Sequence, residues 1–457
     1  MNTTQSRQMR LSAFLSRDGS YHLAGWRHPN AYADGGTNVA RWIDYARILE
    51  RGKFDMMFIA DGISPSGVDH LDSLSHASRS SGFEPLTLLS ALSSVTERLG
   101  LAATVPTTWF EPYIVARMMA SLDHLSSGRA GWNLVTGRNA EDAKNFGRDS
   151  HFTYDDRYAR AEEFIDVVFG LWDSYDDDAL LHDKKNGRFF DPKKVHLLHH
   201  KGSHFSVKGP LSVSRPPQGH PVVIQAGDSE AARELAARTA DAMFTAQLSL
   251  ESAKTFYADV KGRLAKFGRS PDSLMILPGV NLYVGRTAEE ADEKFELMQS
   301  LIPKEYAVHQ LSVQLGGVDL SGYPLDGPMP EVQSTLSRAN PMKWLAFARQ
   351  ENLTLLQTAL RAAASKSHWV LKGSPTEVAD QLELWFTSGA CDGFNLLPPA
   401  VPGDLTDFVE FVLPELRRRG LFRTEYEGRT LRENLGLSRP PDRASREHDA
   451  PSPALSA

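Results

Sequence analysis

Residues 222–230 have the order expected of an anion-binding turn. The short apolar run Val222–Ala226 leads into Gly227, Asp228 and Ser229, and a helix-forming segment follows. Free backbone N–H groups at a helix start attract an anion, and a glycine lets a phosphate approach the backbone. The Ser229 hydroxyl adds a further contact. A well-capped helix without a ligand is the alternative. For a phosphate to bind, the Asp228 carboxylate, which would repel it, must point away from the turn to cap the helix.

Three polar residues stand at or inside predicted strands. Asp61 comes directly after the apolar run 54–60, and Thr107 follows the next such run. In an α/β barrel both would lie at the carboxyl edge of the strands, where ligands bind. Each is equally suited to capping or turning the next segment. Asn133 lies inside the run 130–136, where a buried amide needs a hydrogen-bond partner in the core or in a ligand.

Four further side chains carry weaker signals. Tyr154 and Tyr158 are four residues apart at the start of a predicted helix, so they share a face that either meets a ligand or packs on the core. His28 follows the first strand and is a candidate catalytic residue, although a lone histidine is more often structural. Arg138 follows the strand at 130–136. It is a second catalytic candidate, because it can pair with an anionic substrate group, or it can lie in solvent.

The motifs of several other enzyme classes are missing from the sequence. There is one cysteine, and the histidines lack the spacing of a metal site, so we predict no intrachain disulfide and no metal. No Gly-x-Ser-x-Gly elbow, phosphate loop or Gly-x-Gly-x-x-Gly fingerprint is found. A nicotinamide dinucleotide site of the Rossmann type is therefore not supported.

Eight β-rich apolar runs recur along the chain, and most are followed by a predicted helix. The runs are 11–15, 54–60, 101–105, 130–136, 222–226, 242–245, 274–284 and 391–397. Two-residue hairpin signals between them are missing. The pattern predicts a single (β/α)8 TIM barrel over residues 1–437. Residues 173–220 and 302–370 break the rhythm and are predicted insertions, and residues 438–457 are predicted to be a disordered tail.

Composition narrows the class of protein further. The 457 residues include 50 basic and 57 acidic ones, for a net charge of −7. No block of Lys and Arg stands out, so we expect no nucleic-acid partner. We find no apolar run of 18 residues and no signal-peptide pattern. A cytoplasmic protein without membrane association is expected.

Several runs of sequence resemble the bacterial-luciferase-like flavin monooxygenases. The resemblance is strongest to the group of nitrilotriacetate monooxygenase, dibenzothiophene-sulfone monooxygenase and the pristinamycin synthase large subunit. Matching runs include Gly25-Trp26-Arg27-His28-Pro29, Phe83-Glu84-Pro85-Leu86, Gly131-Trp132-Asn133-Leu134-Val135-Thr136, Gln225-Ala226-Gly227 and Asp392-Gly393-Phe394-Asn395. They occur in order and cover nearly the whole chain, so together they are specific.

The resemblance implies roles for the residues singled out above. In such proteins the positions of Asp61 and Thr107 line the flavin ring. The positions of Tyr154 and Tyr158 contact the ribityl-phosphate side, and the turn at 227–229 holds the phosphate. Relatives often have histidine where this chain has Tyr154, so this contact differs here.

The resemblance also implies an activity and its partners. We expect a (β/α)8 barrel that takes FMNH2 from a separate NAD(P)H:flavin reductase, uses O2 as co-substrate, and forms a homodimer or homotetramer. The two insertions are candidates for the substrate wall. Alkane-oxidising relatives have histidine at the position of Arg138, which argues against an alkane substrate.

The predicted function is therefore an FMNH2-dependent two-component monooxygenase acting on a small polar or anionic organic substrate, by C–N or C–S cleavage or oxygen insertion. Two alternatives remain open from the sequence. One is a deazaflavin-dependent oxidoreductase of the same barrel class. The other is a flavin-binding protein without turnover.

Overall fold

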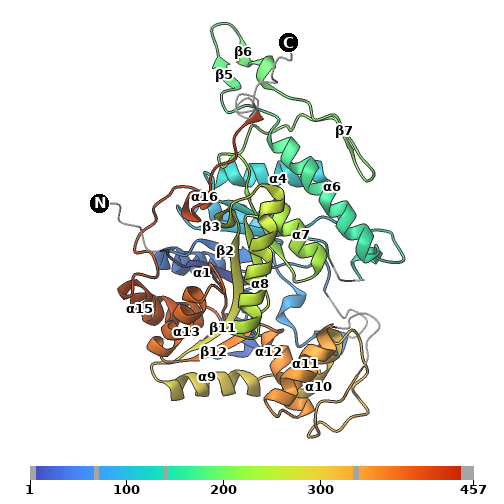
Figure 1. The fold of residues 1–457 in the computed structure, drawn as a ribbon, viewed down its shortest axis with the longest axis vertical. Coiled ribbons are helices and arrows are strands. Elements are labelled where there is room, and N and C mark those ends of the chain that lie inside the picture. Colours follow the sequence, from blue (N-terminus) through green and yellow to red (C-terminus); the bar gives the residue numbers. More distant parts are fainter. Residues whose placement is uncertain (1–6, 66–70, 138, 140, 333–338, 444–457) are drawn as a thin grey trace.

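Eight parallel strands form a closed barrel in the middle of the molecule (Figure 1). The computed structural model describes residues 7–65, 71–137, 139, 141–332 and 339–443. Around the ring the strands are β1 (Arg10–Leu15), β2 (Met56–Ile59), β3 (Gly100–Pro106), β4 (Ala130–Val135), β9 (Val222–Ala226), β10 (Ala242–Thr245), β11 (Met275–Val284) and β13 (Gly393–Leu397). Pairing of β13 with β1 closes the ring. The predicted (β/α)8 barrel is confirmed.

A ninth strand, β12 (Trp369–Gly373), pairs in parallel with residues 280–284 of β11. Sequence analysis did not predict it. The run is short, and only Leu371 and Gly373 in it are buried, so the apolar signal is weak. The ten-residue β11 provides the pairing edge because it continues beyond the part that pairs with β13.

Helices surround the barrel and bury their apolar stripes against it. The longer ones are α1 (Val39–Gly52), α3 (Pro85–Ser93), α4 (Pro112–Leu125), α6 (Tyr154–Trp172), α7 (Glu230–Thr239), α8 (Leu250–Arg263), α9 (Ala288–Ser300) and α13 (Pro375–Thr387). Short ones are α2 (Leu71–Leu74), α5 (Asp142–Asn145) and α16 (Leu431–Asn434). In α1, Trp42, Tyr45, Ala46 and Leu49 are buried, which is the spacing of one helix face.

The helical segment 403–418, which follows β13, is interrupted. It consists of α14 (Gly403–Asp407), a π-helical turn over Phe408–Val412, and α15 (Leu413–Arg418). Pro414 at the start of α15 has no backbone N–H to continue the regular ladder, and a π turn just before it accommodates this defect.

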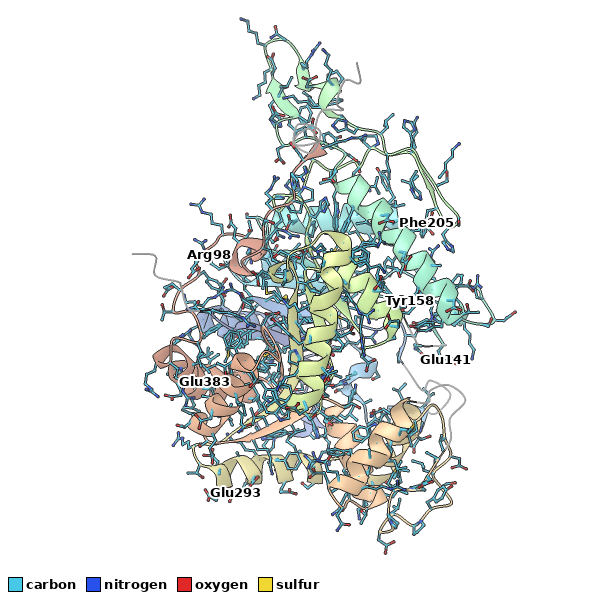
Figure 2. All side chains as sticks on the ribbon, viewed as in Figure 1. Arg98, Glu141, Tyr158, Phe205, Glu293 and Glu383 are labelled. Atoms are coloured by element: carbon cyan, nitrogen blue, oxygen red, sulfur yellow. The ribbon has the colours of Figure 1, made fainter. Side chains whose placement is uncertain are left out.

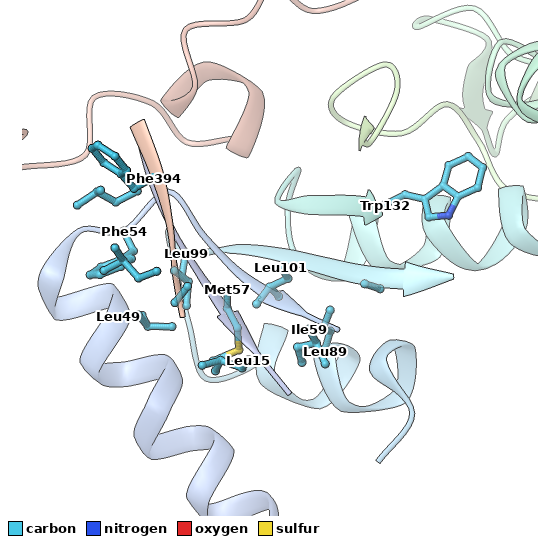
Figure 3. Close-up of a cluster of buried hydrophobic side chains, with 14 of the residues drawn as sticks. Leu15, Leu49, Phe54, Met57, Ile59, Leu89, Leu99, Leu101, Trp132 and Phe394 are labelled. Carbon is cyan, nitrogen blue, oxygen red and sulfur yellow. The ribbon is translucent and has the colours of Figure 1, made fainter. Parts of the chain in front are cut away.

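The main core lies between the barrel and the helices (Figure 3). Outward-facing strand residues such as Met57, Leu101 and Phe394 join helix residues such as Leu49 and Leu89 in this cluster. The alternate strand positions fill the barrel interior in a second cluster, which includes Met56, Phe58, Ala102, Val222 and Ile224. Each large side chain buried in this way contributes about 1.5–3 kcal/mol to the stability of the fold relative to an exposed one. This packing fixes the positions of the strand ends.

The two predicted insertions lie at opposite ends of the view in Figure 1. Residues 302–370 contain α10 (Lys304–Gln314), α11 (Ala339–Gln350) and α12 (Leu355–Ser365), whose side chains form their own core cluster. Residues 173–220 carry the hairpin of β5 (Leu180–Asp183) with β6 (Arg188–Phe190), which projects from the molecule, and the hairpin of β7 (His200–Lys201) with β8 (Ser206–Val207).

The first residues of the predicted disordered tail are held against the 173–220 insertion. Arg439 pairs with Asp177 at 2.6 Å, and the carbonyl oxygens of Pro440 and Pro441 accept hydrogen bonds from Arg215 at 2.9 and 3.0 Å. Residues 444–457 lie outside the described residues. None of the helices that the structure describes is both long and apolar enough to cross a membrane.

Candidate active site

Two cavities lie side by side at the carboxyl ends of the barrel strands and share a wall at Asp61 and Gly62. The first cavity has a volume of about 450 Å³. It is lined by the loop after β2, the ends of β3 and β4, the start of α6, and the turn between β9 and α7. The second cavity, of about 350 Å³, is lined by the loops after β1 and β2 and by part of the 302–370 insertion.

The turn between β9 and α7 brings hydroxyl groups to a helix start in the first cavity. Ser229 is the N-cap of α7, and its Oγ accepts a hydrogen bond from the Ala232 N–H at 3.3 Å. The Tyr154 hydroxyl donates to the same Oγ at 2.8 Å, and the Tyr158 hydroxyl lies 3.4 Å from it. This arrangement offers an anion the helix dipole together with several hydroxyl donors.

Gly227 lets the chain turn closely at this point. Its φ of +132° is unfavourable for a residue with a side chain, and a Cβ there would lie 3.1 Å from the Cβ of Ala232. Asp228 also lines the first cavity. Figure 2 shows Tyr158 near the start of α6, on the side of the molecule that carries Glu141 of the loop after β4. Burial, above all other causes, raises the pKa of Tyr158, so its hydroxyl stays a neutral donor.

Thr107 and Asn133 support the first cavity without being among its lining residues in the described part of the chain. Thr107 is fully buried, and its N–H donates to the Val135 carbonyl at 2.9 Å. Asn133 shares an inward face of β4 with Gly131, and its Nδ2 donates to Thr104 Oγ1 at 2.9 Å. The Asn133 Oδ1 is buried and has no hydrogen-bond partner among the described residues, so it can accept one from a ligand or a water.

Hydrogen bonds tie the loop after β2 to the loop after β4. The Ser64 N–H donates to Asp142 Oδ1 at 3.2 Å, and Asn145 Nδ2 donates to Ser64 Oγ at 2.7 Å. Asn139 Nδ2 donates to the same Asp142 oxygen at 3.3 Å. These contacts fix one wall of the first cavity, which both Asn139 and Asp142 line.

Asp61 stands in the wall between the two cavities and forms an ion pair with Arg17. The Arg17 Nε lies 2.7 Å from Asp61 Oδ1, and both side chains are 14% exposed. Burial raises the pKa of Asp61, and the nearby Arg17 charge partly offsets this effect. The carboxylate is thus held in place by a cation that belongs to the second cavity.

The second cavity contains cationic side chains that sequence analysis did not single out: Arg17, Arg79 and Lys366. Arg17 follows β1, Arg79 lies in the 3-10 turn η2 (Ser78–Ser80), and Lys366 follows α12. The insertion also supplies Tyr306 and Gln310 from α10. The 173–220 insertion supplies none of the described residues that line either cavity.

The two catalytic candidates, His28 and Arg138, differ in where the structure places them. His28 follows the turn η1 (Gly25–Arg27), its Nδ1 accepts from the Asn30 N–H at 3.2 Å, and it is not among the described residues that line either cavity. Burial and then the charge of Lys294 lower its pKa. Arg138 lies outside the described residues, although its neighbours Gly137 and Asn139 line the first cavity.

The first cavity is suited to a planar ligand with an anionic tail. Pro106, Leu134 and Val135 provide apolar surface, and the Ser229 turn provides the anion site. Its described lining contains no Cys, His or Lys, and its titratable side chains are those of Asp61, Asp142, Tyr154, Tyr158 and Asp228. Over the described ranges, no three or more His, Cys, Asp and Glu side chains gather in a way that could hold a metal ion.

Comparison with known proteins gives a consistent result. The family model described as luciferase-like monooxygenase matches residues 20–391. The chain is 49% identical to nitrilotriacetate monooxygenase component A of Aminobacter aminovorans, over 95% of this chain and 98% of that one. It is 46% identical to N-acetyl-S-(2-succino)cysteine monooxygenase of Bacillus subtilis strain 168, over 96% and 99% of the two chains. The structure of EDTA monooxygenase from Chelativorans sp. BNC1 superposes with a TM-score of 0.80 at 31% identity, over 95% and 100% of the two chains.

Proposed function

Because the chain belongs to the luciferase-like monooxygenase family and is a flavin-dependent monooxygenase, we propose that it is the oxygenase of a two-component system. In this system a separate NAD(P)H:flavin reductase supplies FMNH2, and O2 is the co-substrate. The substrate is a small polar or anionic organic molecule, which the names of the nitrilotriacetate and N-acetyl-S-(2-succino)cysteine enzymes support. We also infer a homodimer or homotetramer.

The observation that carries the proposal is the convergence of Ser229, Tyr154 and Tyr158 at the start of α7. These groups would hold the FMN phosphate in the first cavity, and Gly227 would give it close access to the backbone; Asp228 of the same turn also lines this cavity. Pro106 and the end of β4, in the same lining, would provide the apolar surface for the flavin ring. Bound FMNH2 supplies the two electrons with which one atom of O2 is transferred to substrate and the other leaves as water.

The protein's own contribution is orientation and exclusion of water. Thr107 and Asn133 would support the cofactor site from behind its lining, and Asn133 Oδ1 would be an acceptor available there. The bonds from Ser64 to Asp142 and from Asn145 to Ser64 keep the loops over the first cavity together. Asp61 lies in the wall between the two cavities, and the charge of its carboxylate is balanced by Arg17.

A screen of candidate substrates tests the proposal. The full chain is mixed with FMN, NADH and a generic flavin reductase, and products are identified by mass spectrometry. We expect oxygenated or cleaved products only when reductase, FMN and O2 are all present. Product formation with a reduced deazaflavin and none with FMNH2 would favour the deazaflavin alternative, and FMNH2 binding without any product across a broad screen would favour the non-catalytic one.

A further inference from the structure

Three polar residues inside the barrel have side-chain atoms without a hydrogen-bond partner. Ser12 of β1, Asn395 of β13 and Asn281 of β11 are each at most 2% exposed. Four of their buried atoms find no partner in the described part of the chain: Ser12 Oγ, Asn395 Oδ1, and both Oδ1 and Nδ2 of Asn281. Leaving a buried polar atom unpaired is costly, so each of these atoms calls for a partner.

The strand register places these three side chains together. Ser12 lies opposite Asn395 in the pairing of β1 with β13. Asn395 lies opposite Gly279 in the pairing of β13 with β11, and Asn281 is two residues beyond Gly279. All three side chains point into the barrel, because the residues next to them in each strand belong to the core between the barrel and the helices. They therefore form one polar cluster on three adjacent strands.

Aromatic rings lie between this cluster and the second cavity. Phe14, the next inward residue of β1 after Ser12, lines the second cavity. Its ring centroid is 5.1 Å from that of Phe58 and 5.1 Å from that of Phe244. The ring of His368 stacks on Phe244 at 5.0 Å. The three polar residues are not among the described lining residues of either cavity, so the cluster lies beneath the floor of the second one.

We propose that the barrel interior contains a buried water site bounded by Ser12, Asn281 and Asn395. Asn281 Nδ2 only donates a hydrogen bond, the two amide oxygens only accept one, and the Ser12 hydroxyl does either. An anion cannot donate to the amide oxygens, and a metal ion cannot accept from Nδ2, whereas water does both. Since a buried water makes about three hydrogen bonds, the four protein atoms call for about two waters that also bond each other.

This inference goes beyond the proposed function, because the site needs neither flavin nor substrate. The floor of the second cavity would rest on a hydrogen-bonded layer instead of purely apolar packing. Water enclosed beneath the rings of Phe14, Phe58 and Phe244 exchanges with the solvent only when the structure opens locally. Such waters stay bound for longer than the protein takes to tumble, which makes them countable in solution.

Magnetic relaxation dispersion of the water oxygen, measured on the full chain without flavin, tests the proposal by counting long-lived waters. Asn281→Leu and Asn395→Leu keep a branched side chain but remove its polar atoms. We expect each variant to lose at least one long-lived water relative to the wild type. A high-resolution crystal structure of the wild type should show water within hydrogen-bond distance of both amides.

Asn30→Leu is the matched control, because Asn30 is an exposed residue of the loop after η1. This variant should have the same number of long-lived waters as the wild type. Anaerobic titration with FMNH2 shows whether each variant is folded, since the polar cluster contributes no described residue to the first cavity. If the leucine variants do not fold, Ser12→Ala, which removes a single oxygen, and the wild-type crystal structure decide.

Two results would overturn the proposal. One is a wild-type crystal structure in which the amides of Asn281 and Asn395 bond directly to each other or to Ser12, without water. The other is an equal number of long-lived waters in the wild type and in every folded variant of the cluster. Neither result depends on whether the chain binds FMNH2, so the flavin assignment is tested separately.

Discussion

At the scale of single residues, Ser229 joins a helix cap to the proposed phosphate site. Aspartate is as good a helix N-cap as serine, so Ser229→Asp keeps α7 but adds a negative charge where the phosphate would bind. We expect FMNH2 affinity to fall ten-fold or more in an anaerobic titration, with the melting temperature nearly unchanged. Ser374→Asp, the same change at the N-cap of α13, is the control. Unchanged affinity in Ser229→Asp would remove the phosphate assignment.

His22 gives the folded protein a measurable sensitivity to acid. It is 1% exposed, and burial followed by the charge of Arg79 lowers its pKa from 6.5 to about 3. Below pH 6.5 His22 therefore binds a proton in the unfolded chain but not in the folded chain. The free energy of unfolding falls as the pH falls through this range. This one group lowers the free energy of unfolding by about 2 kcal/mol between pH 7 and pH 5.

The measurement is urea unfolding of wild type and His22→Gln at both pH values. The variant should lose less stability on acidification than the wild type does. His204→Gln removes an exposed histidine and serves as the control, because it should leave the pH dependence as in the wild type. Identical losses in His22→Gln and wild type would show that His22 is not the responsible group.

The sequence predicted those site residues that directly follow an apolar run typical of a buried strand. Asp61 and the turn at 227–229 directly follow buried runs, and the structure brings them to one cavity. Arg79 and Lys366 have no such signal, and Arg17, although it follows the run 11–15, was not singled out. They come from separate loops, and Lys366 reaches the second cavity only because the insertion packs beside the strand ends. Such convergence depends on tertiary packing, which a local pattern does not contain.

At the scale of elements, the barrel strands were predictable because parallel strands buried on both faces are continuous apolar runs. The strand β12 escaped because it is half exposed and pairs with only one end of β11. The helix α3 ends at Ser93. The Thr96 hydroxyl and carbonyl beyond it accept hydrogen bonds from the buried Arg129, a contact distant in sequence.

The insertion helices can be loosened without touching the barrel. Leu311 of α10 is fully buried in a cluster that also includes Leu315, Trp344 and Leu355. Leu311→Ala should cost about 2–5 kcal/mol within that cluster. We expect faster hydrogen exchange in α10 and α12, with FMNH2 affinity retained. Hydrogen exchange and FMNH2 affinity, measured on the same preparation, check this.

Leu101→Ala provides the contrast, because Leu101 belongs to the core between the barrel and its helices (Figure 3). That change should lower the melting temperature of the whole molecule and weaken FMNH2 binding as well. If Leu311→Ala weakened FMNH2 binding to the same extent, the insertion and the barrel would form one cooperative unit and the separation would be wrong.

At the scale of the whole molecule, the chain offers one barrel and no dinucleotide fingerprint. We therefore expect the purified chain, supplied with FMN and O2, not to oxidise NADH at an appreciable rate. Addition of a generic flavin reductase should start NADH consumption, which is followed by absorbance. Robust oxidation of NADH by the isolated chain would contradict the two-component proposal.

Asp61 and Gly62 line both cavities. A ligand in one cavity can therefore change the binding free energy in the other by shifting this wall. A ligand that shifts the Arg17–Asp61 pair from one side alters the binding free energy on the other side. Thermodynamic linkage requires this coupling to be reciprocal: the factor by which one ligand tightens the second equals the factor by which the second tightens the first. The Arg17–Asp61 ion pair is therefore the place where such coupling between a cofactor and a substrate would arise.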